Sequence, residues 1–95
     1  MFTFKATATA SNKNKIYPLN EKHGVLIFVL AEGTQQAEER TMQEMEALGW
    51  RNVLIEKRKE VNSEALEGKD KIVKDAFSSA QRRGFGVVVY EDPIE

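Results

Sequence analysis

The fold is decided by Val25-Leu26-Ile27-Phe28-Val29-Leu30, a stretch that is apolar at every position. Successive side chains of a strand point to opposite faces of a sheet, so a strand of this kind needs cover on both faces. Residues 85–90 have the same character, with Phe85, three valines and Tyr90 around Gly86. Both stretches are therefore predicted to be strands that lie side by side in the centre of one sheet.

Two further strands are predicted to be apolar on one face only. Residues 2–10 alternate strictly, with phenylalanine or alanine on one side and threonine or lysine on the other. Val53 and Ile55 face one way and Leu54 the other, just before the charged run 56–60. Strands with one wet face suit the edges of a sheet, and charges on an edge discourage pairing with another chain.

Two amphipathic helices are predicted between the last three strands. The first begins at Thr34, whose hydroxyl is suited to cap its first turn, and runs to about Leu48, before Gly49. The second follows a cap at Asn62-Ser63 and ends at Gly84. Their apolar stripes comprise Ala37, Thr41, Met45 and Leu48 in the first helix, and Leu66, Val73, Ala76, Phe77 and Ala80 in the second.

This element order predicts a single α/β domain over residues 1–95, with a small four-stranded mixed sheet in a ββαβαβ arrangement. The helices have the length of parallel crossovers, so the last three strands are expected to run parallel in a flavodoxin-like order, 1-2-4-3 or 3-2-4-1. Right-handed crossovers that move in opposite directions place the helices on opposite faces. The alternative is a ferredoxin-like two-layer α+β plait with both helices on one face.

Composition limits the classes of function. The 95 residues include no cysteine and carry a formal net charge of −1, so neither thiolate chemistry nor a global attraction to nucleic acid is expected. The N-terminus lacks the basic start and apolar block of a signal peptide, and the apolar stretch 25–31 is too short to span a bilayer. The chain is predicted to be cytoplasmic and to have no membrane partner.

One helix per face cannot cover four strands, so some apolar sheet surface is left over. Either the connection 11–23 folds over it or a second copy of the chain packs against it. The second solution is preferred, and the sequence predicts a homodimer. The function expected is that of a small binding or interaction domain that acts as a homo-oligomer, with no catalytic residues and no cofactor.

Carboxylates suggest an alternative function. In a parallel sheet the ends of strands meet at one edge, which would bring together Glu32, Glu60, Glu91 and Asp92. Converging carboxylates attract a hard divalent cation such as Mg²⁺, and Gly33 and Thr34 would receive a phosphate at the helix start. The predicted metal ligands are Glu32, Glu91 and Asp92, in a metal-dependent phosphoryl-transfer or nucleotide-binding domain.

The stretch Val25–Gly33, an apolar strand that ends in Glu-Gly before a helix, resembles the first signature of Toprim-type nucleic-acid enzymes. That resemblance implies metal-dependent chemistry on nucleic acids. Such domains carry a later Asp-x-Asp pair at a strand end, and Tyr90-Glu91-Asp92 departs from it. The departure weakens the case for a metal site and for cleavage.

A second alternative is weak nucleic-acid binding, with Tyr17 and Trp50 as stacking rings. The basic residues proposed for it are Lys57, Arg58, Lys59, Arg82 and Arg83. A simpler interpretation is that Lys57 to Lys59 protect an edge strand and that Arg82 and Arg83 favour the end of a helix.

Overall fold

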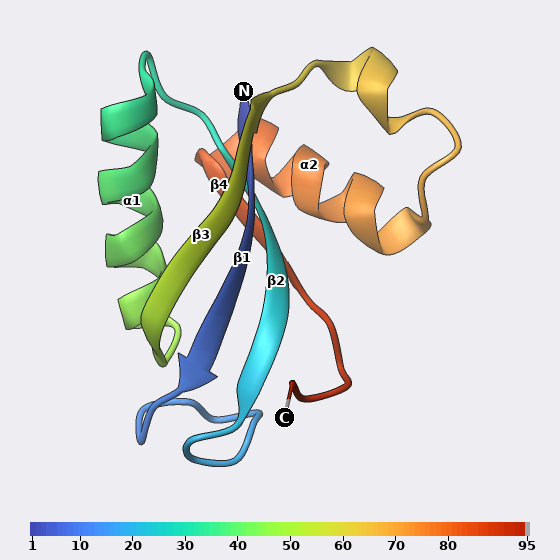
Figure 1. The fold of residues 1–95 in the computed structure, drawn as a ribbon. Helices are drawn as coiled ribbons and strands as arrows, with labels where there is room; N and C mark the ends of the chain where they lie inside the picture. The colour runs from blue at the N-terminus through green and yellow to red at the C-terminus, as the bar shows by residue number, and fades with distance from the viewer. Residues whose placement is uncertain (95) are drawn as a thin grey trace.

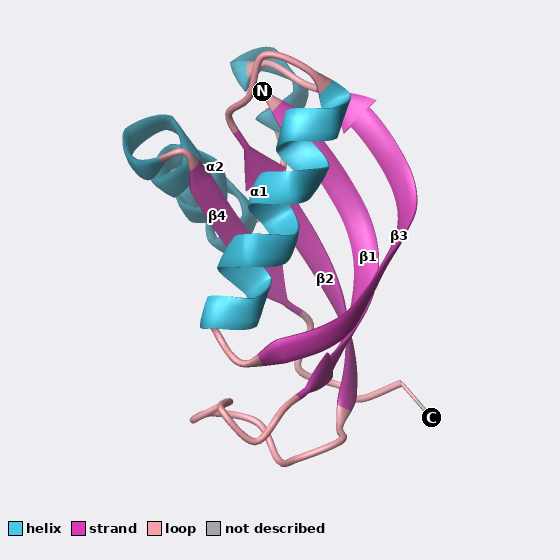
Figure 2. Cartoon of the chain, turned by 90° about the vertical axis from the view of Figure 1, so that its left-hand side faces the viewer, coloured by secondary structure: helices cyan, strands magenta, loops and turns pink. Residues whose placement is uncertain are grey.

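The computed structural model describes residues 1–94 as one four-stranded sheet with two helices. The elements are β1 (Phe2–Ala10), β2 (Lys22–Val29), α1 (Thr34–Ala47), β3 (Trp50–Glu60), a short 3-10 helix (Ser63–Leu66), α2 (Lys71–Arg83) and β4 (Phe85–Val89). The strand order is β3-β1-β2-β4, and every neighbouring pair is antiparallel. Figure 1 shows α1 and α2 on opposite sides of this sheet, and Figure 2 shows the four strands edge to edge behind α1.

The predicted flavodoxin-like orders are wrong. β2 is central and β4 is its neighbour, as predicted, but β1 is the second central strand and β4 lies at an edge. The three last strands are not a parallel set, because β4 runs antiparallel to β2. The prediction failed because β1 was assigned to an edge of the sheet, since one of its faces is polar. An antiparallel sheet can leave one face of a central strand in water.

The helices cover different parts of the two faces. α1 packs on the apolar side of β1, β2 and β3, where Phe4, Ala6 and Val25 are buried. α2 packs on the other side, where its Phe77 meets Phe28 of β2 edge-on at 5.7 Å between ring centroids. Placement on opposite faces agrees with the sequence prediction and excludes the plait with both helices on one face. Among residues 1–94, no helix is long and apolar enough to cross a bilayer.

The connection between β1 and β2 covers the sheet near the C-terminal end of α1. This is one of the two ways expected from the sequence to cover the apolar surface that the helices leave open. Tyr17 packs against the core there, with its ring centroid 5.5 Å from that of Trp50. The Asn14 amide donates to the Gly49 carbonyl at 3.1 Å, and a Cβ on Gly49 would lie 2.5 Å from the Asn14 backbone. Gly49 therefore both ends α1, at φ +91, and admits this segment.

The caps differ in part from expectation. Gly33, with extended backbone, is the N-cap of α1, and Thr34 is the first helical residue without a capping hydrogen bond. The second helix does not follow Asn62-Ser63 as predicted, because Asn62 caps the 3-10 helix, where its side chain accepts from the N–H groups of Glu64 and Ala65, and α2 begins only at Lys71. Gly84 ends α2 in the left-handed conformation, as predicted.

Gly86 sets the distance between β4 and α2. A Cβ at this position would lie 2.0 Å from the Ala76 carbonyl oxygen, which is backbone and cannot rotate away. We expect Gly86→Ala to lower the free energy of unfolding by about 3 kcal/mol, measured by urea denaturation, because α2 must shift. Gly33→Ala is the matched control. A Cβ there meets no atom within 4 Å, so this variant should lose less than about 1 kcal/mol, because alanine caps α1 less well than glycine. Equal losses in the two variants would contradict this account.

Thr41 lies on the buried face of α1 and its hydroxyl has no hydrogen-bond partner among residues 1–94. An unpaired buried hydroxyl costs free energy, whereas valine has nearly the same shape. Thr41→Val should therefore raise the free energy of unfolding by about 1 kcal/mol. Thr34→Val, at an exposed position of the same helix, should leave it nearly unchanged. A loss of stability in Thr41→Val would show that the hydroxyl is satisfied.

Candidate interaction site

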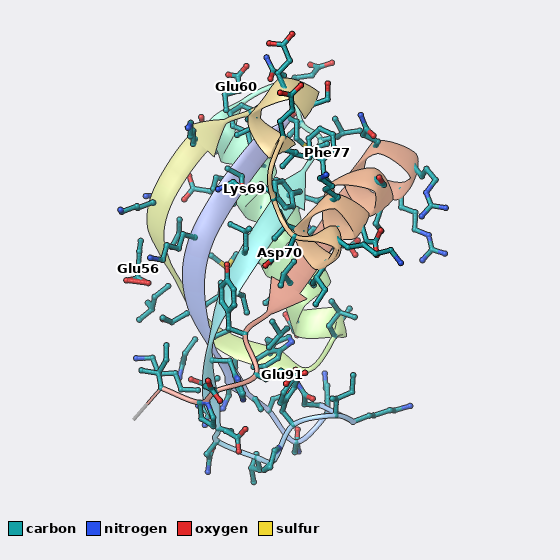
Figure 3. All side chains as sticks on the ribbon, turned by 90° about the vertical axis from the view of Figure 1, so that its right-hand side faces the viewer. Glu56, Glu60, Lys69, Asp70, Phe77 and Glu91 are labelled. Atoms are coloured by element: carbon teal, nitrogen blue, oxygen red, sulfur yellow. The ribbon has the colours of Figure 1, made fainter. Side chains whose placement is uncertain are left out.

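The carboxylates do not converge as the sequence predicted. Glu32 follows the end of β2 and Glu60 ends β3 opposite Phe2, so both lie at one end of the sheet. Glu91 and Asp92 follow β4 at the other end, where the Tyr90 N–H donates to the Gly24 carbonyl. Figure 3 shows Glu60 and Glu91 at these opposite ends. An eight-residue strand such as β2 separates the ends by about 25 Å, so Glu32 cannot share an ion with Glu91 in one chain.

Convergence was expected only because the strands were expected to be parallel. Gly33 and Thr34 begin α1 at the Glu32 end and are likewise remote from Glu91 and Asp92. Within the part of the chain that the structure describes, no group of three or more potential ligands is placed to hold a metal ion.

The basic residues proposed for nucleic acid are also dispersed. Lys57 and Lys59 face away from α1, whereas Arg58 faces α1 and donates to Glu38 at 2.8 Å. Arg82 and Arg83 lie at the end of α2, where the Arg40 guanidinium donates to the Arg83 carbonyl at 3.0 Å. The proposed stacking rings are occupied, because Tyr17 and Trp50 pack against each other and Trp50 is buried.

His23 is fully buried in a polar and aromatic cluster. Its Nδ1 donates to the Tyr90 carbonyl at 2.6 Å, and its Nε2 lies 2.7 Å from Oε1 of Glu21. The rings of Tyr17 and Trp50 flank it, with centroids 4.4 and 5.8 Å away. His23 therefore ties the end of β4 to the start of β2.

The two edges of the sheet differ sharply. β3 was predicted to be an edge protected by charge, and it is an edge with exposed Lys57, Arg58 and Lys59. Its pairing with β1 is also broken by two register shifts, which indicate bulges. β4 has none of these devices, since its sequence FGVVV lacks charge and proline and its register with β2 is continuous.

The outer side of β4 presents backbone groups that no other strand in the described part of the chain pairs with, and one of them, the Phe85 carbonyl, bonds to a side chain of α2. The Tyr90 N–H donates to the Gly24 carbonyl, and the Leu30 N–H donates to the Gly84 carbonyl. The peptide groups of the even-numbered residues of β4 therefore point toward β2. Bonding alternates along an antiparallel ladder, and Phe85, Val87 and Val89 consequently direct their peptide groups outward. The Ser79 hydroxyl donates to the Phe85 carbonyl at 3.3 Å. Within residues 1–94 no strand pairs with this side.

Two hollows that share lining residues lie along this edge, and we call them together the β4 groove. Their volumes are about 680 and 440 Å³, and both are lined by Val87 of β4 and Leu48 after α1. Ile16, Leu48 and Ile72 stand on the walls with 82%, 49% and 67% of their surface exposed. The groove is thus a backbone edge between apolar walls, which is the geometry that accepts an added strand.

The β4 groove was not predicted, because residues 85–90 were expected to lie in the centre of the sheet. The available signal was the contrast between 56–60, which is charged, and 85–89, which is not. Comparisons of the chain with protein-family models, with curated proteins and with solved structures give no match.

The His23 cluster yields a stability prediction. His23→Ala should lower the free energy of unfolding by about 3 kcal/mol, because it opens a cavity and leaves the Tyr90 carbonyl and the Glu21 carboxyl without their partner. Glu21→Gln retains an oxygen acceptor and should cost about 1 kcal/mol or less. Thermal and urea denaturation measure both. If the two variants lose equal stability, the cluster does not hold the strand ends together.

Proposed function

We propose that this chain is a binding domain that works as a homodimer, joined through the β4 groove. The observation that carries the proposal is the outward row of peptide groups at Phe85, Val87 and Val89, between exposed apolar walls. A bare, uncharged edge is a template for another strand. A second copy of the chain supplies a strand that matches it.

The chain is complementary to itself at this edge. When two β4 strands pair antiparallel about a two-fold axis at Val87, Val87 faces its own copy and Phe85 faces Val89 of the other. Every outward residue then meets an outward residue, so the alternation of hydrogen bonds continues across the axis. If the register between the two β4 strands shifted by two residues, one outward-facing residue of each copy would have no residue of the other β4 strand opposite it.

Charges on the groove support the same arrangement. Glu91 lines the end of the groove near Val89, and Arg83 lines the end near Phe85. The two-fold axis brings Glu91 of one copy toward Arg83 of the other, twice in the dimer. Lys13 and Lys15, beside Glu91, are likewise brought toward Glu44. Such pairs fix register and orientation more than they add affinity.

Sedimentation velocity over a range of concentrations tests the dimer. Ile72→Glu and Leu48→Glu place a charge on the apolar walls and should each weaken self-association by about tenfold or more. Leu54→Glu is the matched control, because Leu54 is 59% exposed on the opposite edge of the sheet and should leave association unchanged. At a protein concentration of about 1 mM, an association free energy near 4 kcal/mol is enough to form dimers. A chain that stays monomeric at this concentration would overturn the proposal.

A charge exchange tests the register. Glu91→Arg and Arg83→Glu should each weaken the dimer, and the double variant should regain most of the loss, because the pair is restored across the axis. If the losses in the double variant simply add, the copies pair in another register or through another surface.

A further inference from the structure

The sheet carries a second uncovered surface, which we call the open face. It is the side of β1 and β3 that points away from α1, together with the start of β2. α2 packs on β2 and β4 only, and Figure 3 shows β1 and β3 beside it, covered by neither helix. Its solvent-facing side chains include the basic residues Lys5, Lys22, Arg51, Lys57 and Lys59.

The strand register gathers these cations. Lys5 lies directly opposite Lys57, and Thr9 lies between Lys22 on one side and Arg51 on the other. Like charges directly opposite one another destabilise a sheet. None of the five takes part in an ion pair within residues 1–94. Glu56 lies in the bulge beside Lys57 and projects past the outer edge of β3 (Figure 3). The strands of the open face therefore present five basic side chains in a chain whose net charge is −1. The acidic residues Glu91 and Asp92 lie in the C-terminal segment that meets this face at Lys22.

A row of uncharged residues crosses the open face between the basic groups. Thr7 is paired with Gly24 of β2 and with Leu54 of β3, and Tyr90 follows β4 opposite Gly24. Tyr90 and Leu54 are 48% and 59% exposed. A Cβ on Gly24 would lie 3.3 Å from the Tyr90 ring and 3.9 Å from the Ile94 side chain, so both side chains lie over the glycine. The Ile94 N–H donates to the Lys22 carbonyl beside them at 2.7 Å. Lys5 and Lys57 stand one step along the strands on one side of this row, and Lys22 and Arg51 on the other.

We propose that the open face binds single-stranded nucleic acid. Its bases would contact the row formed by Tyr90 and Leu54, and its phosphates would contact the cations on either side. This combination of an aromatic platform and flanking positive charge suits a ligand whose flat apolar groups alternate with anions. In a duplex the base faces are stacked and cannot reach Tyr90. An acidic peptide would use the cations but has no flat group repeated along its chain.

The site differs from the one expected from the sequence and lies apart from the β4 groove. Lys57 and Lys59 are shared with the earlier prediction, whereas Arg58 faces α1 and Arg82 lies on α2. Lys5, Lys22, Arg51 and Tyr90 join the site through strand pairing. Binding on the open face therefore does not depend on whether the chain forms a dimer.

Fluorescence anisotropy with a labelled single-stranded oligonucleotide of about 12 nucleotides tests the proposal at about 50 mM salt. Lys5→Ala/Lys57→Ala should weaken binding about tenfold or more and reduce the slope of log affinity against log salt. Tyr90→Leu keeps an apolar side chain over Gly24 and should weaken binding about tenfold without changing that slope. Lys74→Ala/Arg82→Ala removes the same charge from α2 and should have little effect. The melting temperature of each variant shows that it is folded.

Several results would overturn the proposal. They are no binding at about 50 mM salt, equal losses in the Lys5/Lys57 and Lys74/Arg82 double variants, and duplex bound as tightly as single strand. Binding that is indifferent to Tyr90→Leu and fully competed by an acidic polypeptide would show a general polyanion surface instead. Repeating the titration with Ile72→Glu separates the two proposals, because a monomeric variant should still bind.

Discussion

The structure depends on β1 pairing along both of its edges. Phe4, Ala6 and Ala8 of this strand are fully or almost fully buried, and small alanines let α1 lie close to the sheet. Because β1 stands between β2 and β3, the strand after α1 must go to one edge and the strand after α2 to the other. The charged edge, the bare edge and the open face all follow from that position.

Local patterns predicted the elements well but not their order. The alternation in 2–10 and the glycines that follow both helices located strands and helix ends close to where they lie. The order failed because an apolar strand was assumed to be central. β4 shows the fault in that step, since α2 covers one of its faces and Phe85, Val87 and Val89 join the core on the other, while its edge stays free. The hydrophobicity of a strand indicates whether its two faces are buried. It does not indicate whether the backbone hydrogen bonds along its edges are paired, because those bonds do not involve side chains.

The same distinction decides which site residues the sequence could predict. Glu32 and Glu91 were predicted to lie together because β2 and β4 were assumed to be parallel. β4 is antiparallel to β2, so the two residues lie at opposite ends of the sheet. Lys5 and Lys57 are more than fifty positions apart in the chain and are joined only by the register of β1 with β3, which two bulges displace. No spacing rule within one segment contains that information. The charged run Lys57 to Lys59 can be recognised in the sequence, but the sequence does not show which of its side chains lie on which face of the sheet.

The two proposed surfaces have a geometric relation. A two-fold axis between antiparallel strands stands perpendicular to the sheet, so pairing of β4 with its copy would make one continuous sheet with both open faces on the same side. The two α2 helices would lie between these faces, because α2 covers β4 and β2 on that side. A short nucleic-acid strand would then occupy one face, and only a strand long enough to pass α2 would reach both. Dimerisation would therefore raise affinity for long strands through effective concentration, while affinity for short ones stayed that of a single chain.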